Sequence, residues 1–429
     1  MKAEFYDSES LAYLGRPAVA QKTFGGDDAG WQPVLLAGET AAVTEKIRLA
    51  MVGGGPGAFI GAVHRLAASM TDRFDLQAGA FCRDAEASRA FGRELGLASA
   101  RSYGSYQELL ASEAALPPAE RVQCLAIVTP NDSHAEIAIA ALAAGFHVLC
   151  DKPAAGCLED ALRMQAAVEA SGQLFGLTHT YTGYPLVMEA RDRIAAGALG
   201  ELRRVHVSYL QDWLSREEDT RGSKQASWRN DPARSGESGA FADIGSHAFN
   251  LVEFMSGESI TAVAAQLRSV VPGRTIDDDG SALFSLSGGA QGLLAASQVC
   301  TGSVNALKIE LFGTEGAMSW QQEQPNTLVL KRRAEPDTIL HANMDYLGAS
   351  ARAVARTPGG HPEGYLEAFA NIYQAFAEAV TAFPEAPQPR GFASIDDGVA
   401  ALRFIRAARL SSQQGSAWTE LAAIERKSL

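Results

Sequence analysis

The stretch IRLAMVGGGPGAFIG, residues 47–61, decides the fold of this chain. It opens with a short apolar run of strand length, passes through a cluster of glycines, and continues as a helix pattern, AFIGAVHRLAASM. A glycine turn between a strand and a helix lets the backbone approach a pyrophosphate, which then lies on the positive N-terminal end of the helix. The usual spacing of this motif corresponds to Gly53, Gly55 and Ala58, with Gly61 in the helix-packing role. The stretch therefore predicts a dinucleotide-binding βαβ unit.

The pattern continues downstream with further strands and helices in alternation. The strand-like runs are FDLQAGAFC (74–82), CLAIVTP (124–130), HVLCDKP (147–153) and LFGLTHT (174–180). Helix patterns of about a dozen residues separate most of them, and such alternation is typical of a parallel sheet. We therefore expect an α/β protein whose N-terminal Rossmann domain covers residues 47–180.

The order of predicted elements changes after about residue 200, where strand-like runs follow one another with only turn residues between them. This pattern predicts a C-terminal α+β domain, residues 181–393, with a large, mostly antiparallel open sheet. We expect the final helix, about 394–412, to pack back on the Rossmann domain. Residues 1–46 have no clean period and are interpreted as an N-terminal arm.

Composition excludes several classes of protein. The chain has 429 residues with a formal net charge of −13, whereas a nucleic-acid partner requires a concentrated basic surface. No apolar run is long enough to span a bilayer, and the acidic, polar start does not resemble a secretion signal. The five cysteines are odd in number and match no zinc spacing, which favours a reduced, cytoplasmic protein.

The end of the second strand leaves the choice of dinucleotide open. An enzyme that selects NAD normally places an Asp or Glu there, bonded to the ribose 2′-hydroxyl. This sequence offers Cys82 and Arg83, followed by Asp84. The arginine fits a 2′-phosphate, while Asp84 fits the hydroxyl, so the sequence leaves NAD and NADP as alternatives.

An acidic residue and a histidine lie four positions apart in the apolar stretch AFADIGSHAFNLVEFMSG, residues 240–257. One helical turn brings Asp243 and His247 to the same face, and buried ionisable groups are costly unless they are paired or used. A satisfied core pair is the simpler interpretation. Lys152 follows a strand that Pro153 terminates, at the carboxyl edge of the sheet where ligands bind, although Asp-Lys-Pro is also compatible with a surface turn.

Taken together, these landmarks resemble the glucose–fructose oxidoreductase, inositol dehydrogenase and MocA (Gfo/Idh/MocA) family. They are the glycine loop with His64 in its helix, VTPNDSH (128–134), CDKP (150–153) and DIGSH (243–247), in the family's order over roughly residues 47–425. Asp151 stands where the family usually has Glu, and the glycine loop is about two residues longer than usual. The resemblance implies a homodimer or homotetramer. It also implies an oxidoreductase that reversibly oxidises a secondary hydroxyl of a sugar, glycoside or cyclitol with NAD or NADP.

The resemblance and the local patterns together define the expected site. The catalytic set carried over from the family is Lys152, Asp243 and His247. The expected cofactor-binding residues are Gly53, Gly55, Pro56, Ala58, Phe59, Ile60, Cys82, Arg83, Asp84, Thr129, Pro130, Asn131, His134, Asp151 and Lys152. The expected substrate-binding residues are Lys152, Tyr181, Gln211, Asp212, Trp228, Arg229, Asp243 and His247. No metal ligand is expected.

Hydride transfer from a carbinol requires a base for the hydroxyl proton, and His247 is the natural candidate because its ordinary pKa lies close to working pH. Asp243 is expected to orient that imidazole, and Lys152 to hydrogen-bond the substrate oxygen or to act as the base itself. The alternatives are a dehydrogenase of another hydroxy compound and a non-catalytic NAD(P)-binding sensor. A metal-dependent hydrolase is disfavoured because the zinc motifs H-E-x-x-H and H-x-x-E-H are missing from the sequence. The identity of the sugar and the oxidised carbon cannot be read from the sequence.

Overall fold

The structure is a computed structural model that describes residues 45–216, 224–229, 231–385 and 391–424. Residues from Glu45 onward form one compact unit. The expected N-terminal arm, residues 1–46, lies almost entirely outside the described residues, so its role stays a prediction.

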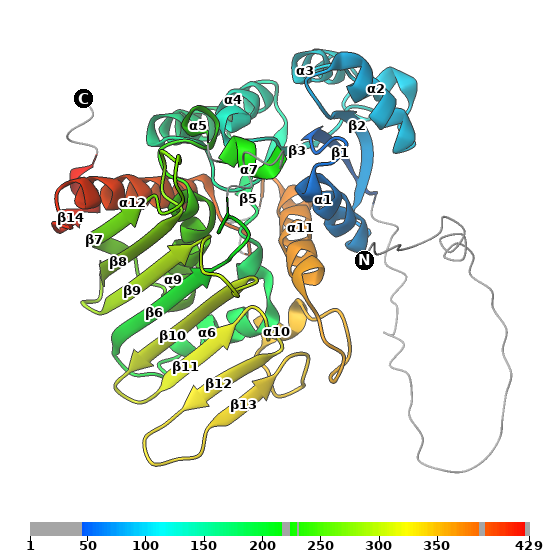
Figure 1. The fold of residues 1–429 in the computed structure, drawn as a ribbon. Helices are drawn as coiled ribbons and strands as arrows, with labels where there is room; N and C mark the ends of the chain where they lie inside the picture. Colours follow the sequence, from blue (N-terminus) through cyan, green and yellow to red (C-terminus); the bar gives the residue numbers. More distant parts are fainter. Residues whose placement is uncertain (1–44, 217–223, 230, 386–390, 425–429) are drawn as a thin grey trace, which may run out of the picture. The chain divides into compact units, whose positions relative to one another are not determined.

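The first sheet is parallel and lies in the N-terminal part of the unit (Figure 1). In spatial order its strands are β2 (Phe74–Ala80), β1 (Ile47–Gly53), β3 (Cys124–Val128), β4 (His147–Cys150) and β5 (Phe175–Leu177). Every residue of β3, β4 and β5 is buried, as expected for parallel strands covered on both faces. The strand order reverses between β1 and β3, and the carboxyl end of a sheet at such a reversal is where α/β proteins bind ligands.

Helices cover both faces of this sheet. The connecting helices are α1 (Phe59–Met70), α2 (Ala85–Glu94), α3 (Tyr106–Ala114), α4 (His134–Ala143) and α5 (Leu158–Ser171), with 3₁₀ turns η1 (Ser99–Arg101), η2 (Asn131–Ser133) and η3 (Thr180–Gly183). Two helices from the end of the chain complete the cover: α11 (Tyr365–Ala382) packs on α1, and α12 (Ile395–Gln413) packs on α5. Residues 365–382 were expected in the second domain, but Phe369 and Tyr373 of α11 share a buried core with residues of β1 and α1.

The second sheet is mostly antiparallel. In spatial order its strands are β13 (Thr338–His341), β12 (Thr327–Lys331), β11 (Ala317–Gln321), β10 (Ala306–Gly313), β6 (Leu202–Leu210), β9 (Gln291–Ser297), β8 (Asp279–Leu286), β7 (Ile260–Arg268) and β14 (Thr419–Glu420). The β6–β9 pair is parallel, and the other neighbours are antiparallel. The fold class expected from the sequence is therefore confirmed.

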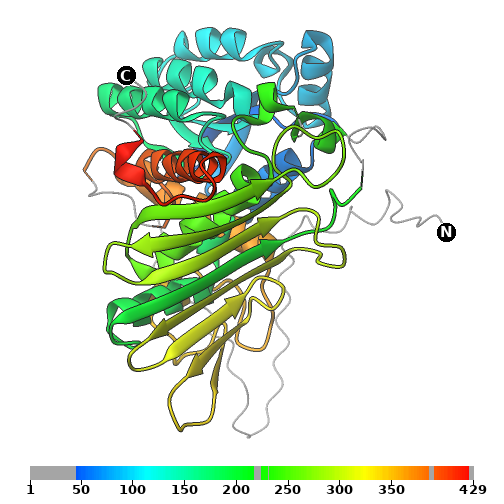
Figure 2. The same ribbon diagram turned by 60° about the vertical axis from the view of Figure 1, so that its left-hand side comes forward.

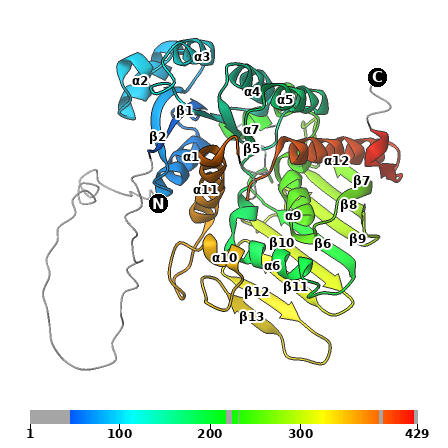
Figure 3. The same ribbon diagram turned by 180° about the vertical axis from the view of Figure 1, so that it is seen from behind.

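Helices lie on one face of this second sheet, which Figure 3 shows from behind, and Figure 2 shows the opposite face open. The strands consequently alternate between buried and more exposed positions, as in β8 and β10. The covering helices are α6 (Pro185–Ala195), α9 (Ser246–Ser256) and α12. The remaining short elements are α7 (Lys224–Arg229), α8 (Pro232–Ser235), α10 (Ala349–Ala353) and η5 (Leu421–Ala423).

The segment expected to form one helix begins instead with a π-helical turn, Phe241–Gly245, that runs directly into α9. The carboxylate of Asp277 fixes its start, accepting hydrogen bonds from the backbone amides of Gly239 (2.9 Å) and Phe241 (2.8 Å). Single π turns often occur at functional sites. This one carries Asp243 at the junction between the two sheets.

Candidate functional site

The glycine turn after β1 has the shape of a phosphate cradle. Gly53, Gly54 and Gly57 have φ values of 90°, 70° and 75°, in the left-handed region where a side chain is strained. A Cβ on Gly55 would lie 2.7 Å from the carbonyl oxygen of Phe81, so this position requires a glycine. No side chain caps the start of α1, and its first turn carries no acidic residue. The first amides of α1 are therefore not used by a side-chain cap, and the turn fits a dinucleotide pyrophosphate.

Gly61 lies one turn into α1, against the glycine loop. A Cβ there would come within 2.3 Å of the Cα of Gly54, so the helix packs on the loop only without a side chain at residue 61. This contact agrees with the helix-packing role expected for Gly61. Of the other loop residues expected to bind the cofactor, Phe59 is 68% exposed and Ile60 is half-buried.

Two side chains in the segment after β3 hold neighbouring parts of the chain together. His134 is fully buried, and its ring nitrogens lie 2.8 Å from the carbonyl oxygen of Thr129 and 3.0 Å from that of Pro153. Since both contacts go to the backbone, His134 ties the end of β3 to the loop after β4. The side chain of Asn131 donates to the carbonyl of Ser235 at 3.1 Å and links the first sheet to α8. Their direct contact with a cofactor stays a prediction.

Lys152 follows the carboxyl end of β4, and its side chain reaches the π-helical turn that precedes α9. Its Nζ donates to the Oδ1 of Asp243 at 2.8 Å and to the carbonyl oxygen of Asp243 at 2.7 Å. Asp151 does not join this pair, because its Oδ1 accepts from the Lys152 amide at 2.8 Å and from the Thr178 hydroxyl at 3.0 Å. The carboxylate at position 151 therefore shapes the loop that presents Lys152.

Asp243 is the centre of the cluster and holds two cations. Its Oδ2 accepts from the Nε of Arg229 at 3.0 Å and from the Nε2 of Gln298 at 2.9 Å, while Oδ1 accepts from Lys152. Burial acts to raise the pKa of Asp243, but the charges of Lys152 and Arg229 and the hydrogen bonds outweigh it and hold that pKa well below its ordinary range. Asp243 is therefore a carboxylate at neutral pH.

Among the described residues, the carboxylate of Asp243 makes no hydrogen bond with His247, so the orienting role expected for Asp243 stays a prediction. Charge-assisted hydrogen bonds from Lys152 and Arg229 are stronger than one from a neutral imidazole, so the carboxylate turns toward the cations. The i,i+4 spacing places Asp243 and His247 one helical turn apart, but it does not by itself make them hydrogen-bond partners.

His247 lies instead among aromatic rings. Its ring centroid is 4.8 Å from that of Tyr181, 5.4 Å from that of His179 and 6.1 Å from that of Tyr209. Its Nδ1 is buried without a hydrogen-bond partner among the described residues. Burial, followed by the charge of Lys152, holds the pKa of His247 well below 6.5, so the imidazole is neutral at neutral pH.

A chain of polar side chains connects Asp243 to the tyrosines near His247. Gln298 also donates to the Oε1 of Gln211 at 3.3 Å, and Gln211 donates to the Oδ1 of Asn305 at 2.7 Å. That same oxygen of Asn305 accepts from the hydroxyl of Tyr209 at 2.7 Å, and the hydroxyls of Tyr209 and Tyr181 are hydrogen-bonded to each other. These side chains form one connected polar network beside the catalytic candidates.

Two tryptophans flank Arg229. Its guanidinium carbon lies 4.3 Å from the ring centroid of Trp228 and 5.7 Å from that of Trp213, within the range of cation–π contact. The Nε1 of Trp213 donates to Gln211 at 2.9 Å, which joins the tryptophan to the polar network. Flat apolar rings beside paired donors and acceptors are suited to a polyol.

Most of the expected substrate residues therefore meet at one place, but Asp212 does not. Its Oδ2 accepts from the backbone amide of Gly302 at 3.0 Å and so stabilises a loop. Five residues of the cluster were not expected from the sequence: His179, Tyr209, Trp213, Gln298 and Asn305. His179 stands in the stretch THTYTGY, whose polar aromatic character was the available signal. For Gln298, the signal was a polar residue ending the apolar run GLLAAS.

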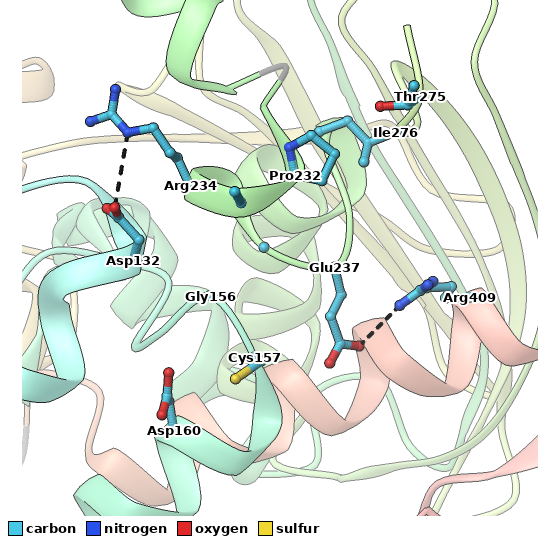
Figure 4. A pocket seen from close by; sticks show the side chains of 12 residues that line it. Asp132, Gly156, Cys157, Asp160, Pro232, Arg234, Glu237, Thr275, Ile276 and Arg409 are labelled. Carbon is cyan, nitrogen blue, oxygen red and sulfur yellow. Dashed lines mark ion pairs between the residues drawn. The ribbon is translucent and has the colours of Figure 1, made fainter.

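A pocket of about 500 Å³ lies beside the start of α5 (Figure 4). Its charged side chains pair across it, Arg234 with Asp132 at 3.9 Å and Arg409 with Glu237 at 3.7 Å. Lys152, Asp243 and His247 are not among the residues that line it. We therefore assign it no catalytic role.

Two further observations concern the part of the chain that the structure describes. Within the described ranges, no group of three or more His, Cys, Asp or Glu side chains is placed to hold a metal ion. The same part of the chain contains no helix that is both long and apolar enough to cross a membrane.

A glycine turn lies at the reversal of the parallel sheet, and Lys152, after β4, pairs with Asp243 on the π-helical turn before α9. Together they have the arrangement of an NAD-binding oxidoreductase. The chain belongs to the GFO/IDH/MocA family: residues 47–179 match its model for the NAD-binding Rossmann fold, and residues 187–319 match its C-terminal domain. The resemblance inferred from the sequence is thereby confirmed, as are the expected oxidoreductase class and the nicotinamide dinucleotide.

Individual relatives agree with this assignment over nearly the whole chain. The uncharacterized oxidoreductase YfiI of Bacillus subtilis is 32% identical over 394 residues, which are 90% of this chain and 100% of that protein. The crystal structure of an oxidoreductase from Sinorhizobium meliloti, 40% identical, has a TM-score of 0.79 and covers 87% of this chain and 99% of its own. An inositol dehydrogenase homolog from Azotobacter vinelandii, solved in complex with NADH and myo-inositol, is 33% identical with a TM-score of 0.80, covering 88% and 98%.

Proposed function

We propose that this protein reversibly oxidises a secondary hydroxyl of a sugar, glycoside or cyclitol, with NAD or NADP as the hydride acceptor. The observation that carries the proposal is the ion pair between Lys152, from the end of a Rossmann strand, and Asp243, from the second sheet's helices. The myo-inositol complex of the Azotobacter vinelandii homolog supports the substrate class.

Lys152 is suited to hold the reacting oxygen. An ammonium has three donor hydrogens, and two are used by the carbonyl and carboxylate of Asp243. The third forms no hydrogen bond with any residue in the described ranges. Lys152 can therefore donate to the substrate oxygen and stabilise the alkoxide as negative charge develops, while Asp243 fixes its position.

His247 is suited to accept the hydroxyl proton. Because its pKa is depressed, the imidazole is already neutral, which is the form that oxidation requires. The bound nicotinamide ring would take the hydride from the carbinol carbon. In the reverse direction, a protonated His247 would return the proton to the alkoxide. Lys152 stays the alternative base.

The polar network supplies the remaining groups of the proposed site. The partly buried Gln211 and Asn305 and the two buried tyrosines supply donors and acceptors, and Trp213 and Trp228 supply flat apolar faces. A site built to hydrogen-bond hydroxyl groups rejects analogues that lack them, because its polar groups would then be left unpaired. This combination favours a polyhydroxylated ring over a simple alcohol.

The test is a panel of sugars, glycosides and inositols with both dinucleotides, followed by absorbance of the reduced cofactor. We expect turnover with at least one cyclic polyol, and we expect His247→Ala to lower kcat at least about a hundredfold while dinucleotide binding persists. His206→Ala, on β6 outside the cluster, is the matched control. Dinucleotide binding without turnover on any compound would indicate a sensor, and unchanged turnover in His247→Ala would exclude this histidine as the base.

We also propose that the open face of the second sheet forms an interface between copies of this chain. Leu283, Leu293 and Trp418 are 43%, 37% and 50% exposed on or beside this face. Light scattering of the purified protein would distinguish a dimer or tetramer from a monomer. The cytoplasmic location and the domain boundary at residues 180–181 stay predictions.

A further inference from the structure

The end of β2 borders the glycine turn directly. A Cβ added to Gly55 would lie 2.7 Å from the carbonyl oxygen of Phe81 and 3.4 Å from the Cβ of Cys82. In a Rossmann fold, the ribose 2′ position of the dinucleotide is recognised by the residues at this strand end. Cys82 and the residues after it are therefore the ones that meet the 2′-hydroxyl or the 2′-phosphate.

No carboxylate is presented at this strand end in the way that NAD selection requires. Cys82 occupies the first position after Phe81, and a thiol is a weak hydrogen-bond partner. Asp84, the acidic candidate from the sequence, is the N-cap of α2: its Oδ1 accepts from the amide of Ala87 at 2.8 Å. An N-cap hydrogen bond stabilises the start of a helix, so moving this carboxylate to a ribose hydroxyl would destabilise α2.

Arg83 places a positive charge at the end of β2. Its side chain is 81% exposed, and its Nη2 lies 3.5 Å from the Oδ2 of Asp132. Asp132 follows β3, and β1 lies between β2 and β3, so Arg83 reaches across the end of β1, where the glycine turn starts. An exposed ion pair of this length is worth little, so Arg83 can exchange Asp132 for a stronger anion at small cost.

Two arginines near this strand end, Arg89 and Arg65, are engaged elsewhere, while Arg234 approaches the same Asp132 oxygen at 3.9 Å. Arg89 donates to both carboxylate oxygens of Glu108, at 3.0 and 2.7 Å. Arg65 donates to the carbonyl oxygen of Gly54 at 3.1 Å, where it supports the turn. The distinctive feature of this strand end is thus an exposed arginine beside a residue that is not acidic.

We infer that Cys82 and Arg83 select a phosphorylated ribose, so that the protein prefers NADP to NAD. This inference rests on the proposed function, in which the glycine turn binds the dinucleotide. A guanidinium binds a phosphate dianion through charge-assisted, often bidentate hydrogen bonds, and a 2′-hydroxyl offers no such charge. One hydrogen bond to a charged group is worth about 1.5–3 kcal/mol, which corresponds to a preference of roughly tenfold to a hundredfold.

The test is calorimetric titration of the intact protein with NAD⁺ and NADP⁺, and with the fragments ADP and 2′,5′-ADP. We expect NADP⁺ to bind at least about tenfold more tightly than NAD⁺, and 2′,5′-ADP to show the same preference over ADP. Arg83→Ala should weaken NADP⁺ about ten- to hundredfold more than NAD⁺. Cys82→Asp should reverse the preference by supplying a carboxylate to the 2′-hydroxyl and repelling the 2′-phosphate.

Arg89→Ala is the matched control, since this arginine lies on α2 nearby and pairs with Glu108; the NADP⁺ to NAD⁺ ratio should not change. Equal or tighter binding of NAD⁺ by the unmodified protein would overturn the inference and leave the proposed function intact. An unchanged ratio in Arg83→Ala would also overturn it. If neither dinucleotide binds, the proposed function fails and this inference fails with it.

Discussion

Replacing Asp243 with asparagine tests the electrostatic arrangement of the site most directly. The carboxylate neutralises Lys152 and Arg229, whose side chains are only 14% and 24% exposed, and its own side chain is 18% exposed. An asparagine has a single acceptor oxygen and no charge, and its amide group would face the donors of Arg229 or Gln298. The substitution therefore leaves two largely buried cations without their counter-charge.

The magnitude follows from these contacts. Removing one partner of a buried ion pair costs about 3–5 kcal/mol, and a unit charge pair at about 4 Å is worth about 4 kcal/mol at the effective dielectric typical of protein sites. Because all three side chains retain some exposure, we expect Asp243→Asn to lower the free energy of unfolding by about 3 kcal/mol. We also expect kcat/KM to fall at least about a hundredfold, since Lys152 loses its fixed position.

The assay combines urea denaturation at pH 7 with steady-state kinetics. Asp212→Asn is the control: its carboxylate accepts only from the Gly302 amide among the described residues, so the expected stability loss is about 1 kcal/mol or less. A double-mutant cycle then identifies the partner of Asp243. We expect a coupling of about 2–4 kcal/mol between Asp243→Asn and Lys152→Met, and below about 0.5 kcal/mol between Asp243→Asn and His247→Ala. The opposite ranking would refute the conclusion that Asp243 holds the lysine rather than the imidazole.

Two further predictions concern buried polar groups. Gln298→Leu removes a hydrogen bond to the Asp243 carboxylate and one to Gln211, so we expect the free energy of unfolding to fall by about 1.5–3 kcal/mol in urea denaturation. Gln291→Leu, at the exposed start of β9, the strand that Gln298 follows, should change stability little, and equal effects would contradict the network. Burial lowers the pKa of His64 from 6.5 to about 4, so the unfolded chain binds the proton more readily between these values. The contribution of His64 to stability is therefore complete above about pH 6.5 and falls by about 1.4 kcal/mol per pH unit as the pH drops toward 4. In His64→Gln this part of the slope should disappear, and denaturation curves between pH 4 and 7 that keep the wild-type slope would exclude it.

The parts of the fold that depend on residues close together in the chain could be predicted from the sequence. The glycine turn, the alternation of strands and helices and the change to consecutive strands each follow from spacing over a few residues, because side-chain periodicity and turn chemistry act locally. For this reason the parallel sheet, the open antiparallel sheet and the family resemblance were all available from the chain alone. Lys152, Asp243 and His247 were found for the same reason, as short motifs at the ends of predicted elements.

The partners of those residues depended on tertiary packing. Lys152 and Asp243 are separated by 91 positions, and Gln298 lies a further 55 positions from Asp243, so only the docking of the two sheets determines that they share one carboxylate. The same docking brings Lys152 to the carboxylate of Asp243. The cap that Asp84 forms on α2 is local by contrast, because its partner Ala87 is only three residues away. The sequence by itself determined the class of fold and the chemical types at the site. The tertiary structure decided which charges neutralise one another, because electrostatic pairing depends on distance in space and not on separation along the chain.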